Sequence, residues 1–474
     1  PYGPVAGLAA PGSVRPGGEG MIAARAVLEA RYRDRVRADP ALTRRLVSFQ
    51  ANKSLPFYRL FKYKEGFSAD LVRRFLQDAP PGGTVLDPFA GAGTTLFAAQ
   101  AAGFHATGIE VLPVGAFAIK ARSALGRVDP DDLAAAVARL RADPLTDAPA
   151  GPGFRHLPIT RGAFSPATEA ALNAYLAAVA AEPDDDIATV LRFAAFAVLE
   201  EISYTRKDGQ FLRWDRRSGR ARATFDKGPV LSFSDAVFGH LGRIQRDLVA
   251  APRPAGPPID LREGSCLAVL PTLPAASFDR VITSPPYCNR YDYTRTYALE
   301  LAFLGVDAEG LKALRQTMLA CTVENRAKRA AIRDLCAAAG QPALFDRADR
   351  AFQDCEALQE VLAALEGARC RGDLNNPGVC RMVAEYCFEH AVVVFALARL
   401  LKPGGRVYYV NDNVRYAGEL IPVDLILAEF AEAAGLEVPA ILTLPHGKGN
   451  SSQQMGRHGR EEVRKCVSVW EAAA

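Results

Sequence analysis

The sequence predicts an α/β protein with a Rossmann-like core and a mainly parallel sheet, and three segments carry this prediction. Residues 85–87 have the pattern of a short strand that runs into a glycine-rich turn, and the Ala- and Leu-rich residues 94–102 have the pattern of a helix. A second strand is expected at 105–109, ending on Glu110. A third strand is expected at 278–282, ending in a proline-rich turn. Strand, glycine turn, helix and strand in this order are typical of a nucleotide-binding half-sheet.

The turn after the first strand has the composition of a ligand-binding loop. Gly91 and Gly93 let the backbone approach a ligand closely and adopt dihedrals that are closed to side chains. The following helix offers free N–H groups at its N-terminus, and Glu110 provides a carboxylate that can accept both hydroxyls of a ribose. The sequence therefore predicts a nucleotide-type site, with a plain strand-to-helix turn as the alternative. Its candidate residues are Asp87, Pro88, Phe89, Ala90, Gly91, Gly93, Thr94, Thr95 and Glu110.

The third strand leads into Ser284, Pro285, Pro286 and Tyr287. Two prolines fix φ and hold the turn rigid. The Ser284 side chain and the Pro285 carbonyl are acceptors that can take the two N–H protons of an amino group, and the Tyr287 ring can stack on a base. These four residues are the candidate catalytic residues, with a purely structural proline-rich turn as the alternative.

These motifs resemble those of the S-adenosylmethionine-dependent DNA amino-methyltransferases. The turn at 87–93 resembles the family's cofactor loop, and Ser-Pro-Pro-Tyr at 284–287 resembles its catalytic motif. The resemblance implies S-adenosyl-L-methionine as the cofactor, double-stranded DNA as the substrate and a target base that is flipped out of the helix. Within the family, the serine form is usually associated with N4 of cytosine, whereas Asp or Asn in its place usually marks N6 of adenine.

The resemblance therefore implies a cytosine-N4 methyltransferase of a restriction-modification or epigenetic system. An exocyclic amine is a poor nucleophile because its lone pair is delocalised into the ring, so acceptors at Ser284 and Pro285 would localise that lone pair. The sulfonium of the cofactor is already an activated donor, so the transfer needs approach and alignment and no metal. The alternatives are N6 of adenine, an RNA amino group and a non-catalytic DNA-binding subunit.

Two further stretches resemble cofactor-binding elements of the same family. Residues 57–68 resemble the element that closes over the methionine end, which implies contacts from Phe57 and Lys62; an ordinary amphipathic helix and loop is the alternative. Residues 264–279 resemble the stretch ahead of the catalytic strand, which implies contacts from Ser265 and Cys266. The family has an acidic residue where Ser265 stands, so the adenine contact usually assigned to that position is open.

The order of the motifs places the cofactor half before the catalytic half, which excludes the permuted arrangement. The long insertion lies between Glu110 and Gly264, so no named class is assigned. Residues 121–200 and 303–370 are Ala- and Leu-rich with helical spacing. We expect a disordered tail or tag at 1–20, N-terminal helices and the cofactor half of a methyltransferase core at 21–120, an insertion at 121–258, the catalytic strand and loop at 259–302, a helical insertion at 303–390 and the C-terminal half of the core at 391–474.

The C-terminal half carries weaker signals. Residues 401–406 are expected to form a helix-ending turn before a strand at 407–410. Asn411, Asp412 and Asn413 follow that strand and are expected either in the pocket wall or in a capped loop. Residues 466–470 alternate like an edge strand.

Candidate DNA-binding residues cluster in one basic segment. Residues 201–227 hold eight basic and four acidic residues with aromatic residues interleaved. That mixture suits a strand or loop that contacts phosphates and base edges, and a solvated basic hairpin is the alternative. The Gly- and Ser-rich stretch 446–460 has donors suited to phosphates, and either insertion is a candidate for the recognition region. The candidates are Arg206, Lys207, Gln210, Arg213, Trp214, Arg290, Lys448, Arg457 and Arg460.

The composition agrees with an intracellular enzyme. The 474 residues, 49% of them hydrophobic and 23% charged, suffice for a large core with inserted subdomains. The net charge of +4 is too small by itself to indicate nucleic acid. Nine cysteines without a Cys-x-x-Cys pair favour reduced thiols, and no apolar run approaches the ~20 residues of a membrane span. We expect a cytoplasmic, nucleoid-associated prokaryotic protein, with a cognate restriction endonuclease as a candidate partner.

Overall fold

The computed structural model describes residues 23–142, 154–208, 211–252, 256–445, 448–449 and 462–474, so the expected tail at 1–20 lies outside the described residues. An eight-stranded sheet has the order β1-β11-β14-β8-β7-β2-β3-β6. Seven strands are parallel, and β14 runs antiparallel between β11 and β8. The predicted Rossmann-like α/β fold is confirmed. The strands are β1 Val36–Ala38, β2 Thr84–Asp87, β3 His105–Glu110, β6 Asp260–Glu263, β7 Phe278–Thr283, β8 Leu401–Asp412, β11 Leu436–Thr443 and β14 Lys465–Ala472.

Both faces of the sheet are buried, as a mainly parallel sheet requires. Successive side chains point to opposite faces, so Val85 packs with one hydrophobic core and Leu86 with the other. Likewise, Ile282 packs with the same core as Val85, and Val281 packs with the same core as Leu86. Short helices cover the first face, whereas long apolar helices cover the second. They are α2 Ala69–Phe75 and α3 Thr94–Ala101 on the first, and α15 Pro342–Asp354, α17 Val379–Leu400 and α18 Val423–Ala433 on the second.

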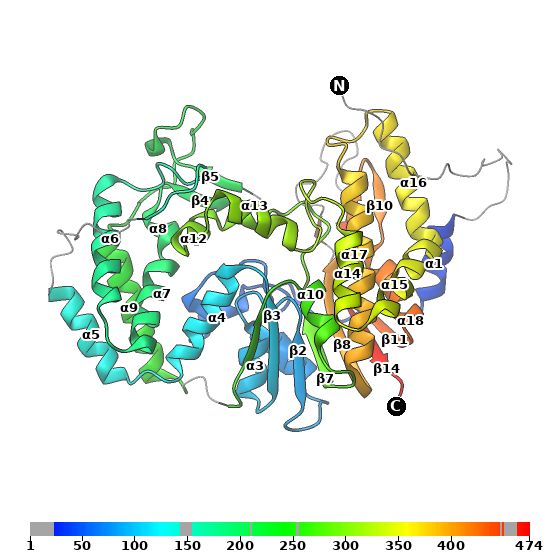
Figure 1. The fold of residues 1–474 in the computed structure, drawn as a ribbon, viewed down its shortest axis with the longest axis horizontal. Helices are drawn as coiled ribbons and strands as arrows, with labels where there is room; N and C mark the ends of the chain where they lie inside the picture. Colours follow the sequence, from blue (N-terminus) through cyan, green and yellow to red (C-terminus); the bar gives the residue numbers. More distant parts are fainter. Residues whose placement is uncertain (1–22, 143–153, 209–210, 253–255, 446–447, 450–461) are drawn as a thin grey trace.

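Two groups of helices stand on either side of the central strands (Figure 1). The group on the left of the figure has its own hydrophobic core, to which Tyr297 and Phe303 contribute from beyond the catalytic strand. It comprises α4 Pro113–Leu125, α5 Pro130–Ala142, α6 Pro166–Ala180, α7 Asp185–Ala197, α8 Leu199–Ile202 and α9 Phe233–Ala250, with α11 Tyr293–Thr296, α12 Ala298–Phe303 and α13 Ala308–Thr317 nearby. The group on the right includes α1 Ala24–Tyr32, α14 Arg329–Ala338 and α16 Glu356–Cys370. The helical character expected for 121–200 and 303–370 is thus confirmed.

Small elements complete the described chain. A hairpin of β4 Thr205–Asp208 and β5 Phe211–Trp214 lies in the basic segment, and β9 Val414–Tyr416 pairs with β10 Glu419–Ile421. β12 Lys448–Gly449 pairs with β13 Glu462–Val463, and the short helix α10 is Cys266–Val269. Among the described helices, none combines the length and the apolar character needed to cross a bilayer.

Two expectations for the C-terminal half are wrong. The helix α17 ends at Leu400 and β8 begins at Leu401, so residues 401–406 form a bulge inside the strand rather than a turn before it. Residues 466–470 lie inside the sheet, because β14 has hydrogen-bonded neighbours on both sides. Even Ser468 is buried there. Alternation reports which face a side chain points to and says nothing about how many strands lie alongside.

Candidate active site

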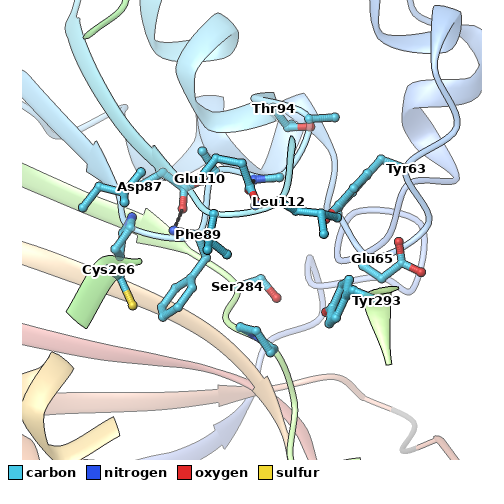
Figure 2. Close-up of a pocket in the computed structure, with 18 of the residues that line it drawn as sticks. Tyr63, Glu65, Asp87, Phe89, Thr94, Glu110, Leu112, Cys266, Ser284 and Tyr293 are labelled. Atoms are coloured by element: carbon cyan, nitrogen blue, oxygen red, sulfur yellow. Dashed lines mark hydrogen bonds between the residues drawn. The ribbon is translucent and has the colours of Figure 1, made fainter. Parts of the chain in front are cut away.

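A cavity of about 970 Å³ opens at the carboxyl ends of β2, β3 and β7 (Figure 2). The cavity wall draws on the glycine turn, the end of β3, the start of α10 and the proline turn, which lie far apart in the sequence. The predicted residues that line it are Asp87, Pro88, Phe89, Ala90, Gly91, Thr94, Glu110, Ser265, Cys266, Ser284 and Pro286. The cofactor half and the catalytic turn therefore share one cavity.

Six predicted residues do not line this cavity: Phe57, Lys62, Gly93, Thr95, Pro285 and Tyr287. Phe57 is buried in the helical core, and its N–H donates to Asp247 Oδ2 at 2.8 Å. Lys62 is exposed. The Thr95 hydroxyl donates to the Ile282 carbonyl at 3.1 Å and so ties α3 to the sheet. Segment 57–68 reaches the cavity through other residues, namely Tyr58, Phe61, Tyr63, Glu65, Gly66 and Phe67.

The glycine turn is closely packed where it passes the ligand space. Gly91 has φ +52°, and a Cβ there would lie 3.0 Å from the Tyr63 ring. Gly93 has φ +78°, and a Cβ there would lie 2.8 Å from Ile119. Both positions combine a left-handed backbone with a close neighbour, so glycine is required for conformation and for space.

Glu110 is the last residue of β3, and its carboxylate holds the glycine turn through a hydrogen bond. Its Oε2 accepts the Gly91 N–H at 2.5 Å, and its Oε1 accepts the Leu112 N–H at 2.7 Å. The side chain is buried, and burial raises the pKa of the carboxyl to about 8, although the two amide donors favour the ionised form. Each carboxylate oxygen keeps a further lone pair for a ligand hydroxyl.

Asp87 joins the glycine turn to the catalytic turn. Its Oδ1 accepts the Thr283 hydroxyl at 2.6 Å and the Phe89 N–H at 3.1 Å. Burial raises the pKa of Asp87 to about 6, against the effect of these donors. Thr283 is the last residue of β7 and directly precedes Ser284. Asp87 therefore lines the cavity and also holds the residue next to Ser284, and Thr283 is a site residue that the sequence analysis did not single out.

The proline turn presents a hydroxyl to the cavity. Ser284 Oγ lies 3.0 Å from the Tyr287 hydroxyl, Pro285 is buried and Pro286 lines the cavity (Figure 2). Behind them, Lys465 Nζ on β14 lies 3.5 Å from the Tyr287 hydroxyl. The sequence analysis missed Lys465, because nothing in its neighbourhood marks it and only the insertion of β14 beside β8 brings it here.

Asn411 and Asp412 are the last residues of β8 and Asn413 follows it, and the contacts of all three lie away from the cavity wall. Asp412 Oδ1 lies 3.3 Å from Lys465 Nζ. Asn411 donates to the Tyr386 hydroxyl at 3.0 Å, and Asn413 accepts the Asp424 N–H at 3.0 Å. None of the three lines the cavity. This stretch therefore does not form the pocket wall. Its one link to the site is the contact of Asp412 with Lys465, which lies behind Tyr287.

The cavity also contains an acidic and aromatic wall that the sequence analysis did not identify. Glu65 accepts hydrogen bonds from the hydroxyls of Tyr297, at 2.5 Å, and Tyr291. Tyr293 lines the cavity on the same side, and Tyr63 stacks on Tyr297 with ring centroids 5.2 Å apart. Figure 2 shows Glu65, Tyr63 and Tyr293 grouped together. Residues 291–297 follow the catalytic turn directly, and proximity in sequence to that turn was the available signal.

Ser265 and Cys266 line the cavity at the start of α10. Gly264, just before them, donates its N–H to the Glu110 carbonyl at 2.9 Å, so this wall is attached to the end of β3. Burial raises the pKa of the Cys266 thiol to about 12, which keeps it uncharged. A neutral thiol and a serine suit contact with an uncharged aromatic ring better than ion pairing.

The predicted DNA-binding residues are distributed unevenly. Arg206 and Arg213 are exposed on the β4–β5 hairpin, and Arg290, beside the proline turn, donates to Asn375 Oδ1 at 3.1 Å. Lys207 is not placed for a DNA contact, because it is buried in an ion pair with Glu300. Gln210, Arg457 and Arg460 lie outside the described residues, and Lys448 is described only through its backbone in β12.

A hollow on the same hairpin combines guanidinium groups with aromatic rings. It is lined by residues of β5 and of the loop that follows, among them Arg213, Trp214 and Arg222. Arg220 Cζ lies 3.5 Å from the Trp214 ring centroid, and Arg213 Cζ lies 4.6 Å from that of Phe225. The same guanidinium groups also make hydrogen bonds at the ring edge: Arg220 donates to the Ile159 and Arg161 carbonyls, and Arg213 donates to Asp208.

Taken as chemistry, the cavity can bind a nucleoside-containing ligand and hold an amino group beside it. The glycine turn and Glu110 provide the nucleoside side, and Ser284 provides a hydroxyl acceptor on the same cavity surface. The basic hairpin provides charge for a polyanion.

Comparisons with known proteins agree with this chemistry. A family model described as DNA methylase matches residues 43–114, which include the glycine turn and Glu110. The chain is 46% identical over 457 residues to the Type II methyltransferase M.AvaI of a Nostoc species, covering 94% of this chain and 92% of that protein. It is 38% identical over 468 residues to the Type II methyltransferase M.BsoBI of Geobacillus stearothermophilus, covering 94% and 91% respectively.

Proposed function

Because this chain belongs to the S-adenosylmethionine-dependent DNA amino-methyltransferases, we propose that it methylates N4 of cytosine within a specific site in duplex DNA. Its methyl donor is S-adenosylmethionine. The relatives are named Type II methyltransferases, which supports a role as the modification enzyme of a restriction-modification system. A cognate endonuclease that cuts the same DNA site is the partner that this role requires.

The observation that carries the choice of cytosine is the serine of the proline turn. Ser284 lines the cavity with a neutral hydroxyl, in the Ser-Pro-Pro-Tyr form usually associated with N4 of cytosine. S-adenosylmethionine supplies an activated methyl group on its sulfonium. Ser284 Oγ and the Pro285 carbonyl accept the two N–H groups of the target amine, which directs its lone pair toward the methyl carbon. Tyr287, whose hydroxyl is hydrogen-bonded to that of Ser284, supports the ring of the flipped base.

We assign the cofactor residues from the same cavity. Glu110 accepts the ribose hydroxyls through the lone pairs left by the Gly91 and Leu112 amides. The glycine turn passes close to the sulfur and the methionine chain, and Ser265 and Cys266 contact the adenine ring. Asp87 is retained as a positioning residue that holds Thr283 next to the catalytic turn.

We further propose that the β4–β5 hairpin contacts DNA through Arg206, Arg213 and Trp214. Its support is the exposed position of both arginines, the hollow that Arg213 shares with Arg220 and Phe225, and the position of Arg206 Cζ 5.8 Å from the Phe225 ring centroid. An arginine stacked on an aromatic ring is held in a fixed plane and presents paired N–H donors, which match the O6 and N7 acceptors of guanine.

The proposal is tested by identifying the methylated base. The purified protein is incubated with duplex DNA and labelled cofactor, and the digested DNA is analysed by mass spectrometry, with methylome sequencing to report the site. N4-methylcytosine is the expected product. N6-methyladenine as the sole product would replace the acceptor and leave the catalytic geometry in place. Absence of any methyl transfer by wild-type protein would favour a non-catalytic DNA-binding subunit.

A further inference from the structure

Arg122 is a buried cation in the wall of the cofactor cavity. It lies on α4, and the whole residue is 7% exposed. Its guanidinium is held between two aromatic rings, with Cζ 3.5 Å from the Tyr58 ring centroid and 4.1 Å from that of Phe97. The side chain lines the same cavity as Glu110 and Ser284. Two stacked rings fix the plane of the guanidinium before any ligand arrives.

The guanidinium has no carboxylate partner among the described residues. No ion pair within 4.0 Å involves Arg122 in this part of the chain, and its buried Nε has no hydrogen-bond partner there. Burial lowers the pKa of Arg122, the Tyr58 hydroxyl opposes that shift, and the nearby Arg73 is another cation. Buried charges in proteins are normally paired, because an unpaired charge inside the protein is costly. An anion supplied by the ligand would complete this arrangement.

The position of Arg122 indicates which part of the ligand supplies that anion. Gly264, Ser265 and Cys266 form the wall attached to the β3 end, whereas Arg122 contacts Phe97 of α3 and Tyr58 of the segment that closes the cavity. The cofactor carries its adenine at one end and a methionine chain with an α-ammonium and an α-carboxylate at the other. Its carboxylate is its only anionic group.

The same cavity offers a match for the other charge of the methionine chain. Glu65 lines the cavity, and its carboxylate is held by the hydroxyls of Tyr291 and Tyr297. A cavity with one fixed acid and one fixed guanidinium is complementary to a zwitterionic amino acid group. Neither residue is needed for recognition of adenine or ribose.

We infer that Arg122 binds the α-carboxylate of the methionine end of S-adenosylmethionine and thereby selects the complete cofactor over adenosyl fragments. This inference rests on the proposed placement of the cofactor in this cavity. Arg122 is a binding residue and takes no part in the transfer step. Planar guanidinium donors match a carboxylate in two parallel hydrogen bonds, which an ammonium cannot reproduce.

The test compares two ligands that differ only in the carboxylate. Isothermal titration without DNA measures binding of S-adenosylmethionine and of decarboxylated S-adenosylmethionine to wild type and to Arg122→Met. Wild type is expected to prefer the carboxylated ligand by roughly 10- to 100-fold, the worth of a hydrogen bond to a charged group. Arg122→Met is expected to lose most of that preference while binding the decarboxylated ligand within about twofold of wild type.

Two controls separate this inference from the proposed function. Glu110→Gln should weaken both ligands alike, because both carry the ribose. Arg122→Lys should retain part of the preference, because the charge stays and the paired geometry is lost. Equal binding of both ligands by wild type, or an equal loss for both in Arg122→Met, would overturn the inference. Methylation of adenine instead of cytosine would change the proposed function and leave the carboxylate preference as it is.

Discussion

Lys207 of β4 and Glu300 of α12 form an ion pair inside the protein, with side chains 4% and 2% exposed. The pair joins the basic hairpin to the helix that follows the catalytic turn. Burial raises the pKa of Glu300, and Lys207 opposes that shift. Lys207 Nζ also lies 4.3 Å from the ring centroid of Tyr297, whose hydroxyl donates to Glu65 in the cavity wall. The residue that charge counting assigned to DNA thus connects the hairpin to the cofactor cavity.

Removing one partner of this pair should destabilise the protein strongly. Lys207→Met leaves the Glu300 carboxylate buried without its counter-charge, which should cost about 3–5 kcal/mol in urea denaturation. The double variant Lys207→Met/Glu300→Leu should recover most of that loss, because no unpaired charge remains. Arg213→Met is the matched control, since its pair with Asp208 is exposed and should be worth less than about 1 kcal/mol. A double variant no more stable than Lys207→Met would contradict the argument.

Glu110 should make the stability of the ligand-free protein depend on pH. Its pKa is about 8 in the folded chain against an ordinary value of 4.5, so the folded state binds the proton more tightly than the unfolded state. The contribution of Glu110 to the free energy of unfolding should therefore be fully present below pH 4.5, and it should be lost as pH rises through about 8. Glu110→Gln should flatten this decline in denaturation series measured between about pH 5 and about pH 9. An unchanged pH profile in Glu110→Gln would show that another group is responsible.

Glu110 should also contribute directly to cofactor affinity. Glu110→Ala removes the acceptor for the ribose hydroxyls and should weaken S-adenosylmethionine binding by about 1.5–3 kcal/mol in calorimetry. Circular dichroism supplies the control for the fold. Unchanged affinity in a folded Glu110→Ala protein would remove Glu110 from the site.

Ser284 should affect turnover much more than DNA affinity. Ser284→Ala removes an acceptor that positions the target amine and should lower kcat by roughly 100-fold or more, with DNA binding nearly unchanged. Tyr287→Phe keeps the ring and removes only the hydroxyl bonded to Ser284, so it should retain more activity than Tyr287→Ala. Single-turnover kinetics and band-shift titrations measure the two quantities separately. Parallel losses of turnover and DNA affinity in Ser284→Ala would indicate a structural role.

The two exposed arginines of the hairpin should have different effects on DNA binding. Arg206→Ala should weaken binding to all sequences and reduce the salt slope by about 1, as for a phosphate contact. Arg213→Ala should relax discrimination at one base pair by about 1–3 kcal/mol. Arg139→Ala on α5, whose exposed side chain pairs with Glu182, is the control and should change neither quantity. If both hairpin variants behave like this control, recognition must lie elsewhere, with residues 303–370 as the next candidate.

The parts of the site that local sequence patterns predict are those built from one continuous segment. The glycine turn and Ser284 follow directly from strands and Glu110 ends one, so strand ends and turn chemistry were enough to predict that they meet at one cavity. Lys465 reaches the site from a distant strand, and Arg122 reaches it from the last turn of α4. Their roles depend on which elements become neighbours, and no local pattern encodes that choice.

Packing in the folded protein explains why some residues do not have the positions predicted from the sequence. Lys207 belongs to a charge-rich segment, and its partner Glu300 lies ninety-three positions later in the sequence. The two can form their ion pair only once α12 packs against the hairpin. Phe57 and Lys62 belong to a segment that does reach the cavity, but other residues of that segment line it. The segment lies in the cavity wall, its predicted contact with the methionine end of the cofactor stays a prediction, and the choice of side chains required the three-dimensional structure.

The position of β14 imposes an order on the assembly of the protein during synthesis. Its two neighbours, β8 and β11, both precede it in the sequence, so a ribosome completes them first. Until β14 arrives, these strands have facing edges with unpaired backbone groups, and they cannot pair with each other without blocking the native insertion. Exposed apolar edges of this kind are where chains associate wrongly. The yield of correctly assembled protein therefore depends on how long that gap stays open, and slower growth at low temperature or a chaperone that shields the gap should raise it.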